Sequence, residues 1–280
     1  MKSFNYVKAT TLEEASNILI ENGAKATILN GGTDLLVRLR ENLIQPEAIV
    51  DIKGIPELKD TYYDENTGLT IGAMTTMNGL GEIKEIQENY AFLADAAHTV
   101  GSLQIRNRAT LTGNICNASP LADTATSLLV LEAKVNTYHA KNGRRSIAIH
   151  EFFTGPRTNT LEMGEIVTSI TIPPTKGKGI YIKNARREEV DLSTVGVAVF
   201  KEDNGQFRIA LGAVAATPIR AYKAEEIISN QEVTEDRIEQ AAKVARETAT
   251  PITDIRASKE YRSEMVEVMT RRAIKKLIEA

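Results

Sequence analysis

The sequence is poor in the residue types that several classes of site require. It contains one cysteine, Cys116, no tryptophan, and only 5% aromatic residues among 280 positions. A single cysteine excludes an internal disulfide framework and any zinc or iron–sulfur site built from cysteines of this chain alone. The three histidines, His98, His139 and His150, lack metal-ligand spacing. We therefore expect no metal site.

Excess charge and long apolar runs are also missing. Lysine and arginine total 34 against 37 acidic residues, a formal charge of -3, so the electrostatic footprint of a nucleic-acid-binding protein is absent. No stretch approaches the roughly 20 apolar residues of a membrane helix. The opening residues have no basic segment followed by an apolar core, so we expect no secretory signal and a cytoplasmic location.

Motifs for enzymatic chemistry are likewise lacking. The sequence has no GxGxxG fingerprint, no GxxxxGK[ST] loop, no nucleophile elbow and no HExxH, which argues against a Rossmann site, a P-loop and hydrolytic chemistry. We predict no catalytic side chain. Polar loops without an acid–base or metal constellation are typical of a protein that holds a cofactor and lets the cofactor do the chemistry.

The first fifty or so residues predict a small αβ unit. Thr11 and Glu14 form a capping-box pattern for a helix that ends at Gly23. Short apolar strands are expected at 26–29 and 48–52. Between them, Asn30-Gly31-Gly32-Thr33-Asp34 leads into leucines at helical spacing.

The middle of the chain predicts hairpins around 66–68 and 142–143 and a strand at 166–172. Residues 101–123 fit neither a helix nor an alternating strand, and they are rich in Gly, Asn, Thr and Ser. A long irregular stretch inside a compact domain is usually functional.

A Pro-Pro pair at 173–174 and a Lys/Gly run to 179 indicate a domain boundary. Beyond it, strands are expected at 179–185, 194–201 and 207–214, followed by helices at 223–229, 234–248 and 259–278. This order is typical of an antiparallel sheet with helices. We predict an α+β protein with domains 1–175 (subdomains 1–55 and 56–175) and 176–280.

Three segments are candidate sites. The Gly31-Gly32 turn lets backbone approach a ligand and offers N–H groups to phosphate oxygens, although taken alone a tight strand-to-helix turn is the favoured reading. Residues 109–123 offer neutral donors and acceptors suited to sugar hydroxyls and a pyrophosphate, or to the loop's own backbone. The charged run 183–191 could meet a phosphate or a partner, although a solvated run is favoured. The lone Cys116 is more typical of a small buried apolar residue.

These segments resemble the FAD-binding subunit of molybdenum hydroxylases, the xanthine dehydrogenase and carbon monoxide dehydrogenase family. The match begins at Asn30–Leu36 and continues from Gly101–Arg108 through Thr112-Gly113-Asn114 to Ala118–Asp123. Further matches are Glu151–Gly155, Glu165–Val167, Lys183 with Arg186-Arg187, and Asp191-Leu192. The resemblance thus covers essentially the whole chain in order.

The resemblance implies a two-part FAD-binding domain of the PCMH type followed by a smaller C-terminal domain. It implies that residues 29–35 wrap the pyrophosphate of FAD. The second loop, together with Asp123, would hold the phosphates, the ribityl chain and the adenosine. Near the flavin ring system would lie Gly101, Val167, Lys183 and Leu192. Thr112 stands where the family often has glycine, and its methyl is expected to narrow the loop. The implied cofactor-binding residues are Leu29, Asn30, Gly31, Gly32, Thr33, Asp34, Leu35, Gly101, Ala109, Thr110, Gly113, Asn114, Cys116, Asn117, Ala122, Asp123, Val167, Lys183 and Leu192.

The function implied is electron transfer within a hetero-oligomer. A molybdenum-cofactor subunit would hydroxylate the substrate, an iron–sulfur subunit would pass single electrons, and FAD on this chain would deliver a hydride to NAD+ or electrons to another acceptor. The xanthine dehydrogenase type is expected, while the hydroxylated substrate and the subunit stoichiometry stay open. Two alternatives are a stand-alone flavin reductase on the same FAD-binding fold, related to the enolpyruvyl-sugar reductases, and a scaffold that has lost flavin.

Overall fold

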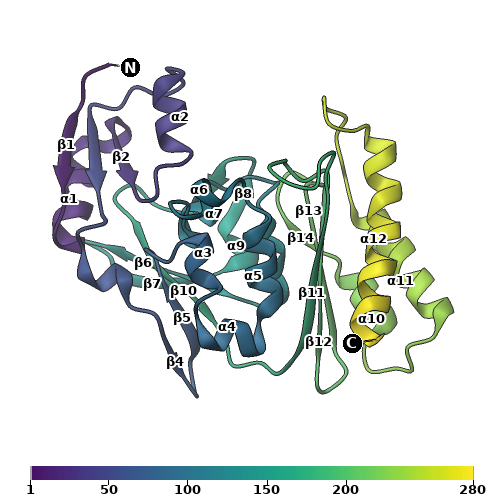
Figure 1. The fold of residues 1–280 in the computed structure, drawn as a ribbon. Helices are drawn as coiled ribbons and strands as arrows, with labels where there is room; N and C mark the ends of the chain where they lie inside the picture. The colour runs from purple at the N-terminus through teal and green to yellow at the C-terminus, as the bar shows by residue number, and fades with distance from the viewer. Residues whose placement is uncertain (1, 280) are drawn as a thin grey trace.

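The computed structural model describes residues 2–279, which form alternating layers of sheet and helix behind a small N-terminal unit (Figure 1). From the N-terminal unit the layers run through a five-stranded sheet, a helical layer, a four-stranded sheet and a final layer of helices. The predicted α+β class is confirmed. Within residues 2–279, no helix is both long and apolar enough to cross a membrane.

The N-terminal unit is a three-stranded parallel sheet in the order β1-β3-β2. Thr11 caps α1 by accepting a hydrogen bond from the backbone N–H of Glu14 (3.1 Å). The Glu14 carboxylate, however, accepts from the N–H of Thr10 rather than Thr11 (2.8 Å), so the predicted capping box closes one residue early. The elements are β1 Asn5–Lys8, α1 Leu12–Asn22, η1 Gly23–Lys25, β2 Ala26–Leu29, α2 Leu35–Arg40, β3 Ala48–Asp51 and η2 Pro56–Lys59.

The five-stranded sheet is antiparallel, in the order β4-β5-β10-β6-β7. Both predicted hairpins are confirmed, since Tyr63 pairs with Leu69 and Val135 pairs with Ile147. Its strands are β4 Tyr62–Asp64, β5 Gly68–Gly72, β6 Lys134–His139, β7 Gly143–Ala148 and β10 Ile166–Ile172. Around it lie α3 Met77–Leu80, α4 Lys84–Asn89, α5 Ala91–His98, α8 Asp123–Val130, α9 Ile149–Phe152, β8 Phe153–Gly155 and β9 Thr158–Asn159.

Residues 101–123 are more regular than the sequence indicates. They contain two short helices, α6 Leu103–Arg106 and α7 Leu111–Cys116. The side chains of Ser102 and Thr110 begin these helices by accepting backbone N–H groups three residues ahead. The expectation of a wholly irregular stretch is therefore wrong. A helix of four to six residues is too short to show a helical spacing of apolar residues, so the sequence pattern does not indicate it.

The C-terminal part is a four-stranded antiparallel sheet in the order β11-β12-β13-β14, with three helices on one face (Figure 1). The three predicted strands and three predicted helices are found within a few residues of their expected bounds, while the two-residue β14 is missed. The elements are β11 Gly177–Asn184, β12 Val195–Glu202, β13 Phe207–Gly212, β14 Ile219–Arg220, α10 Tyr222–Ile228, α11 Glu235–Thr248 and α12 Lys259–Glu279.

The other face of this sheet is buried against α5 and α8. Phe200 of β12 stacks on Phe92 of α5 with ring centroids 6.0 Å apart. Gly179 of β11 lies so close that an added Cβ would sit 2.3 Å from the Phe92 ring. The four-stranded sheet therefore shares one hydrophobic core with the chain before it. The domain boundary at 175/176 stays a prediction.

We predict that Phe200→Ala lowers the free energy of unfolding by about 3–5 kcal/mol, because it empties a fully buried site between two layers. Because the core is shared, urea denaturation of the wild type should show a single transition. In Phe200→Ala the whole transition should move to a lower urea concentration. Tyr62→Ala, at an aromatic position that is 55% exposed, is the matched control and should shift it little. Two transitions, of which only one moves, would contradict the shared core.

Candidate functional site

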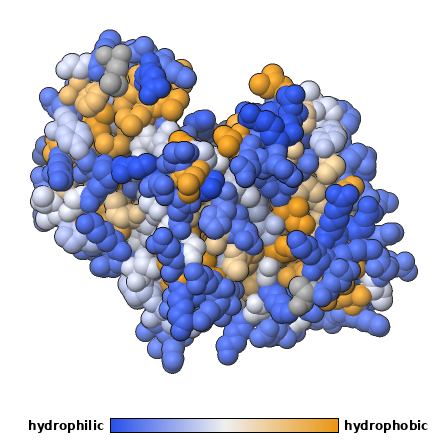
Figure 2. Space-filling view, viewed as in Figure 1, coloured by the Kyte–Doolittle hydropathy of each residue, from blue (hydrophilic) through white to orange (hydrophobic). Residues whose placement is uncertain are grey.

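A cleft of about 350 Å³ opens between the loop before α2 and the loop around α7. Figure 2 shows the surface hollowed at the upper edge of the molecule, between the N-terminal unit and the C-terminal layer. The lining comes from residues 27–38, from Ile52, from residues 100–117, and from Leu161, Ile166 and Val167. The two loops that the sequence singled out therefore face one another across one cavity.

The first loop presents unsatisfied backbone donors to this cleft. None of the N–H groups of residues 31–35 donates a hydrogen bond to another residue in the part of the chain that the structure describes. Successive free N–H groups in a turn form a concave site for an anion such as a phosphate.

The two loops touch through their backbones at Gly31. A Cβ added there would lie 2.0 Å from the carbonyl oxygen of Arg108, so only glycine allows this approach. Asn117 on the second loop also donates from Nδ2 to Oδ1 of Asp34 on the first, at 3.2 Å. The width of the cleft is fixed by these contacts.

Asn30 anchors the floor of the cleft and leaves one acceptor open. Its Nδ2 donates to the carbonyl oxygen of Ala73 at 3.0 Å and to Oγ1 of Thr112 at 3.3 Å. Its Oδ1 is buried without a hydrogen-bond partner among the described residues. Such an orphaned oxygen in a cleft is suited to a ligand that brings a donor.

The hydroxyl of Thr112 is used in a hydrogen bond within the protein and is not free to bind a phosphate. Its Oγ1 donates to the carbonyl oxygen of Ala73 at 2.9 Å, and the residue is 2% exposed. The side chain therefore holds α7 against the segment that follows β5. That contact is available to threonine and would not be available to glycine.

Cys116 lines the cleft as a neutral thiol. Burial raises its pKa from 9.0 to about 12, because the thiolate loses hydration there. Its role is therefore apolar lining rather than nucleophilic or redox chemistry.

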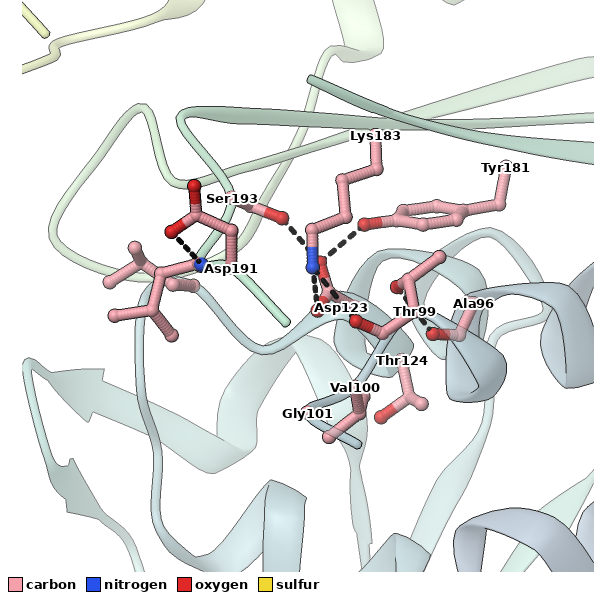
Figure 3. A network of polar contacts seen from close by, with 12 residues as sticks. Ala96, Thr99, Val100, Gly101, Asp123, Thr124, Tyr181, Lys183, Asp191 and Ser193 are labelled. Atoms are coloured by element: carbon pink, nitrogen blue, oxygen red, sulfur yellow. Dashed lines mark hydrogen bonds and ion pairs between the residues drawn. The ribbon is translucent and has the colours of Figure 1, made fainter. Parts of the chain in front are cut away.

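A second polar cluster surrounds Asp123, where α8 begins (Figure 3). Lys183 Nζ lies 3.0 Å from Oδ2 of Asp123 and donates to the carbonyl oxygen of Thr99, also at 3.0 Å. Tyr181 donates to Oδ1 of Asp123 at 2.6 Å, and Ser193 donates to the same oxygen. The carboxylate is only 8% exposed, so these donors replace its water.

Burial and the neighbouring Asp123 carboxylate raise the pKa of Tyr181 well above 10.0, which keeps its hydroxyl a donor across the physiological range. The cluster joins α8 to β11 and to the segment before β12. It borders the cleft through neighbouring residues, since Val100 lines the cleft next to Thr99. Asn114, also in the lining, accepts a hydrogen bond from Thr124 (2.7 Å), the neighbour of Asp123.

Most of the site residues implied by the sequence meet in the cleft. The lining contains Asn30, Gly31, Gly32, Thr33, Asp34, Leu35, Ala109, Thr110, Gly113, Asn114, Cys116, Asn117 and Val167. Outside it are Leu29, Gly101, Ala122, Asp123, Lys183 and Leu192. Leu29, Gly101 and Ala122 are each next in sequence to a residue of the lining or of the Asp123 cluster, and Leu192 is 49% exposed beside Ser193.

Sequence reasoning missed several polar residues of the site, among them Thr27 in the lining of the cleft. Arg38 lines the cleft one helical turn after Asp34, and this spacing was the available signal. Tyr181 and Ser193 join the Asp123 cluster, but nothing local in the sequence pairs them with α8. The charged run at 186–190 is exposed throughout, in keeping with a solvated segment.

The fold and the cleft define a flavoprotein of the molybdopterin dehydrogenase class. Residues 2–175 match the family of the FAD binding domain in molybdopterin dehydrogenase, and residues 180–277 match the CO dehydrogenase flavoprotein C-terminal domain. The chain belongs to this family of FAD-binding subunits, and its cofactor is FAD. The free N–H groups of the first loop and the open acceptor on Asn30 fit a cofactor that carries a pyrophosphate and sugar hydroxyls.

The relatives span nearly the same length as this chain. The xanthine dehydrogenase FAD-binding subunit of Escherichia coli O157:H7 is 36% identical over 283 residues, covering 99% of this chain and 96% of the relative. The carbon monoxide dehydrogenase medium chain of Hydrogenophaga pseudoflava is 31% identical, with 97% and 96% covered. A solved structure of carbon monoxide dehydrogenase from Hydrogenophaga pseudoflava superposes with a TM-score of 0.94 at 31% identity, covering 99% and 98%.

We predict that Gly31→Ala weakens FAD binding, because the added methyl would collide with the Arg108 carbonyl and force the loops apart. Overpacking of this kind lowers the free energy of unfolding by about 1–3 kcal/mol, which urea denaturation measures. Quenching of flavin fluorescence should show a raised Kd for FAD. Gly81→Ala is the control, since its Cβ would meet nothing closer than 3.5 Å. If the two variants have the same Kd for FAD and the same free energy of unfolding, the contact at Gly31 does not determine the width of the cleft.

The raised pKa of Cys116 predicts an unreactive thiol in the folded protein. At pH 8 a pKa of about 12 instead of 9.0 lowers the thiolate fraction by about 1,000-fold. A chromogenic disulfide reagent should therefore react slowly with native protein and quickly in urea. The chain has one cysteine, so the signal has one source, and similar rates in both conditions would contradict the raised pKa of the thiol.

Proposed function

We propose that this chain is the FAD-carrying subunit of a molybdenum hydroxylase of the xanthine dehydrogenase type. The observation that carries the proposal is the 36% identity to a xanthine dehydrogenase FAD-binding subunit, maintained over 99% of this chain. The cleft supports it, because the residues matched at both flavin loops line a single cavity.

In this proposal the chain binds and orients FAD and supplies no acid or base. When bound, FAD takes up electrons from iron–sulfur clusters and passes them on as a hydride to NAD+ or as electrons to another acceptor. The N–H groups of residues 31–35 bind the pyrophosphate. The second loop holds the ribityl chain and the adenosine half, and Val167 with Leu192 lies near the ring.

The Asp123 cluster has a defined part in this arrangement. Lys183 uses two donors, on Asp123 and on the Thr99 carbonyl, so an ammonium group keeps one N–H for a ligand. The side chains of Lys183 and Asp123 form an ion pair, with 3.0 Å between Nζ and Oδ2, and both are almost fully buried. We assign to Lys183 the role of a fixed positive charge at the flavin end of the site, with Asp123 as its support.

The partners in the proposal are an iron–sulfur subunit and a molybdenum-cofactor subunit. A single cysteine in the sequence cannot ligate an iron–sulfur cluster, which takes four protein ligands. The clusters and the molybdenum would therefore be carried by other chains, and the working unit would be a hetero-oligomer.

The test is to express this chain alone and together with its candidate partners and to follow the flavin absorption without oxygen. We expect NADH to bleach the flavin in both preparations. Xanthine should bleach it only in the complex, because the hydroxylation site would be on the molybdenum subunit. Dithionite serves as the control that the flavin can be reduced.

Different failures point to different parts of the proposal. If xanthine leaves the flavin oxidised in a complex that contains molybdenum, the xanthine assignment is wrong. If NADH leaves it oxidised while dithionite bleaches it, NAD+ is not the acceptor. A native assembly that contains flavin but no cluster-bearing partner would favour the stand-alone flavin reductase.

A further inference from the structure

Arg38 of α2 is the one cation among the described residues that line the cleft. The lining is otherwise neutral except for Asp34, whose carboxylate accepts from Asn117. The Arg38 side chain is half-buried, and its guanidinium makes no hydrogen bond or ion pair with any residue that the structure describes. A guanidinium carries five N–H donors, and all five of Arg38 are open to a ligand in the cleft as far as the described residues are concerned.

Helix geometry directs Arg38 toward the first loop. The backbone N–H of Arg38 donates to the carbonyl oxygen of Asp34 at 3.1 Å, so the two residues lie one turn apart. Side chains on an α-helix lean toward its N-terminus and cover the preceding turn. The guanidinium of Arg38 is therefore on the side of the unpaired N–H groups of residues 31–35.

We propose that Arg38 binds the pyrophosphate of FAD through its guanidinium. The N–H groups of residues 31–35 supply directional donors but no full charge, while the pyrophosphate is an anion in a cleft that also holds Asp34. The planar fork of arginine matches two phosphate oxygens at once. Arg38 thus offsets the charge of the cofactor and of Asp34, and fixes the phosphates against the loop. The inference rests on the proposed pyrophosphate site in residues 31–35.

Arg40 provides a matched control on the same helix. It is also an arginine, two residues further on, but it is exposed and does not line the cleft. Any effect of removing positive charge from α2 in general would appear equally in Arg40→Gln. Only a direct contact would distinguish Arg38→Gln from it.

The experiment is a titration of FAD into the apoprotein of the full chain, followed by quenching of flavin fluorescence. We expect Arg38→Gln to raise the Kd about tenfold, since a hydrogen bond to a charged group contributes enough for that factor. Arg38→Lys should recover part of the loss because it keeps the charge without the fork. Arg40→Gln should bind as the wild type does.

Two further measurements separate a phosphate contact from other roles. The difference in Kd for FAD between wild type and Arg38→Gln should become smaller as the salt concentration is raised from about 50 to about 500 mM. The reason is that salt screens a partly exposed charge contact. The absorption spectrum of bound flavin should be unchanged, because the pyrophosphate is remote from the ring. The melting temperatures of the apoproteins should agree, because Arg38 has no partner to lose.

The outcomes that would overturn the proposal are distinct. If wild type binds FAD and Arg38→Gln binds it equally well, or no worse than Arg40→Gln, Arg38 does not bind the pyrophosphate while the proposed function stands. An altered flavin spectrum in Arg38→Gln would place the side chain against the ring instead. If the wild-type chain fails to bind FAD at all, the proposed function and this inference both fall.

Discussion

The close approach of Gly31 to the Arg108 carbonyl is the constraint on which the site depends. A Cβ at that point would lie 2.0 Å from the oxygen, so the N-terminal unit can sit at this distance from α7 only because position 31 has no side chain. The approach brings the free N–H groups of residues 31–35 opposite the polar face of the second loop. Everything else about the cleft follows from that spacing.

The second constraint is electrostatic and joins different layers. Asp123 begins α8, while Lys183 and Tyr181 belong to β11, and both donate hydrogen bonds to the Asp123 carboxylate, which is 8% exposed. Losing Lys183 and Tyr181 of β11 would remove the ion pair and one of the hydroxyl donors of a buried carboxylate, which is strongly destabilising. The stacked pair of Phe92 and Phe200 joins the same layers through apolar contact. The Asp123 cluster, which we propose as the flavin end of the site, is thus placed by the same contacts that hold the C-terminal sheet.

The local pattern of the sequence was sufficient for much of the fold. The strand at 166–172 and the final helix appeared where alternation and helical spacing predicted them, because these segments are long enough to show a period. The helices α6 and α7 were missed because four to six residues do not show one. For the site, motif resemblance found both loops, but Tyr181 and Ser193 are about 60 to 70 residues from Asp123 in sequence, and no local pattern relates them.

The sequence by itself determined that the chain is an α+β member of an FAD-binding family, that its single cysteine cannot build a cluster, and which two loops are the candidates for cofactor binding. These properties depend on residue types and on short-range order, which the sequence contains directly. The tertiary structure alone decided that the two loops share one cleft, that Arg38 lines it without a partner among residues 2–279, and that the C-terminal sheet closes onto α5 and α8. Those features arise from contacts between residues far apart in the chain, where packing and desolvation select the partners.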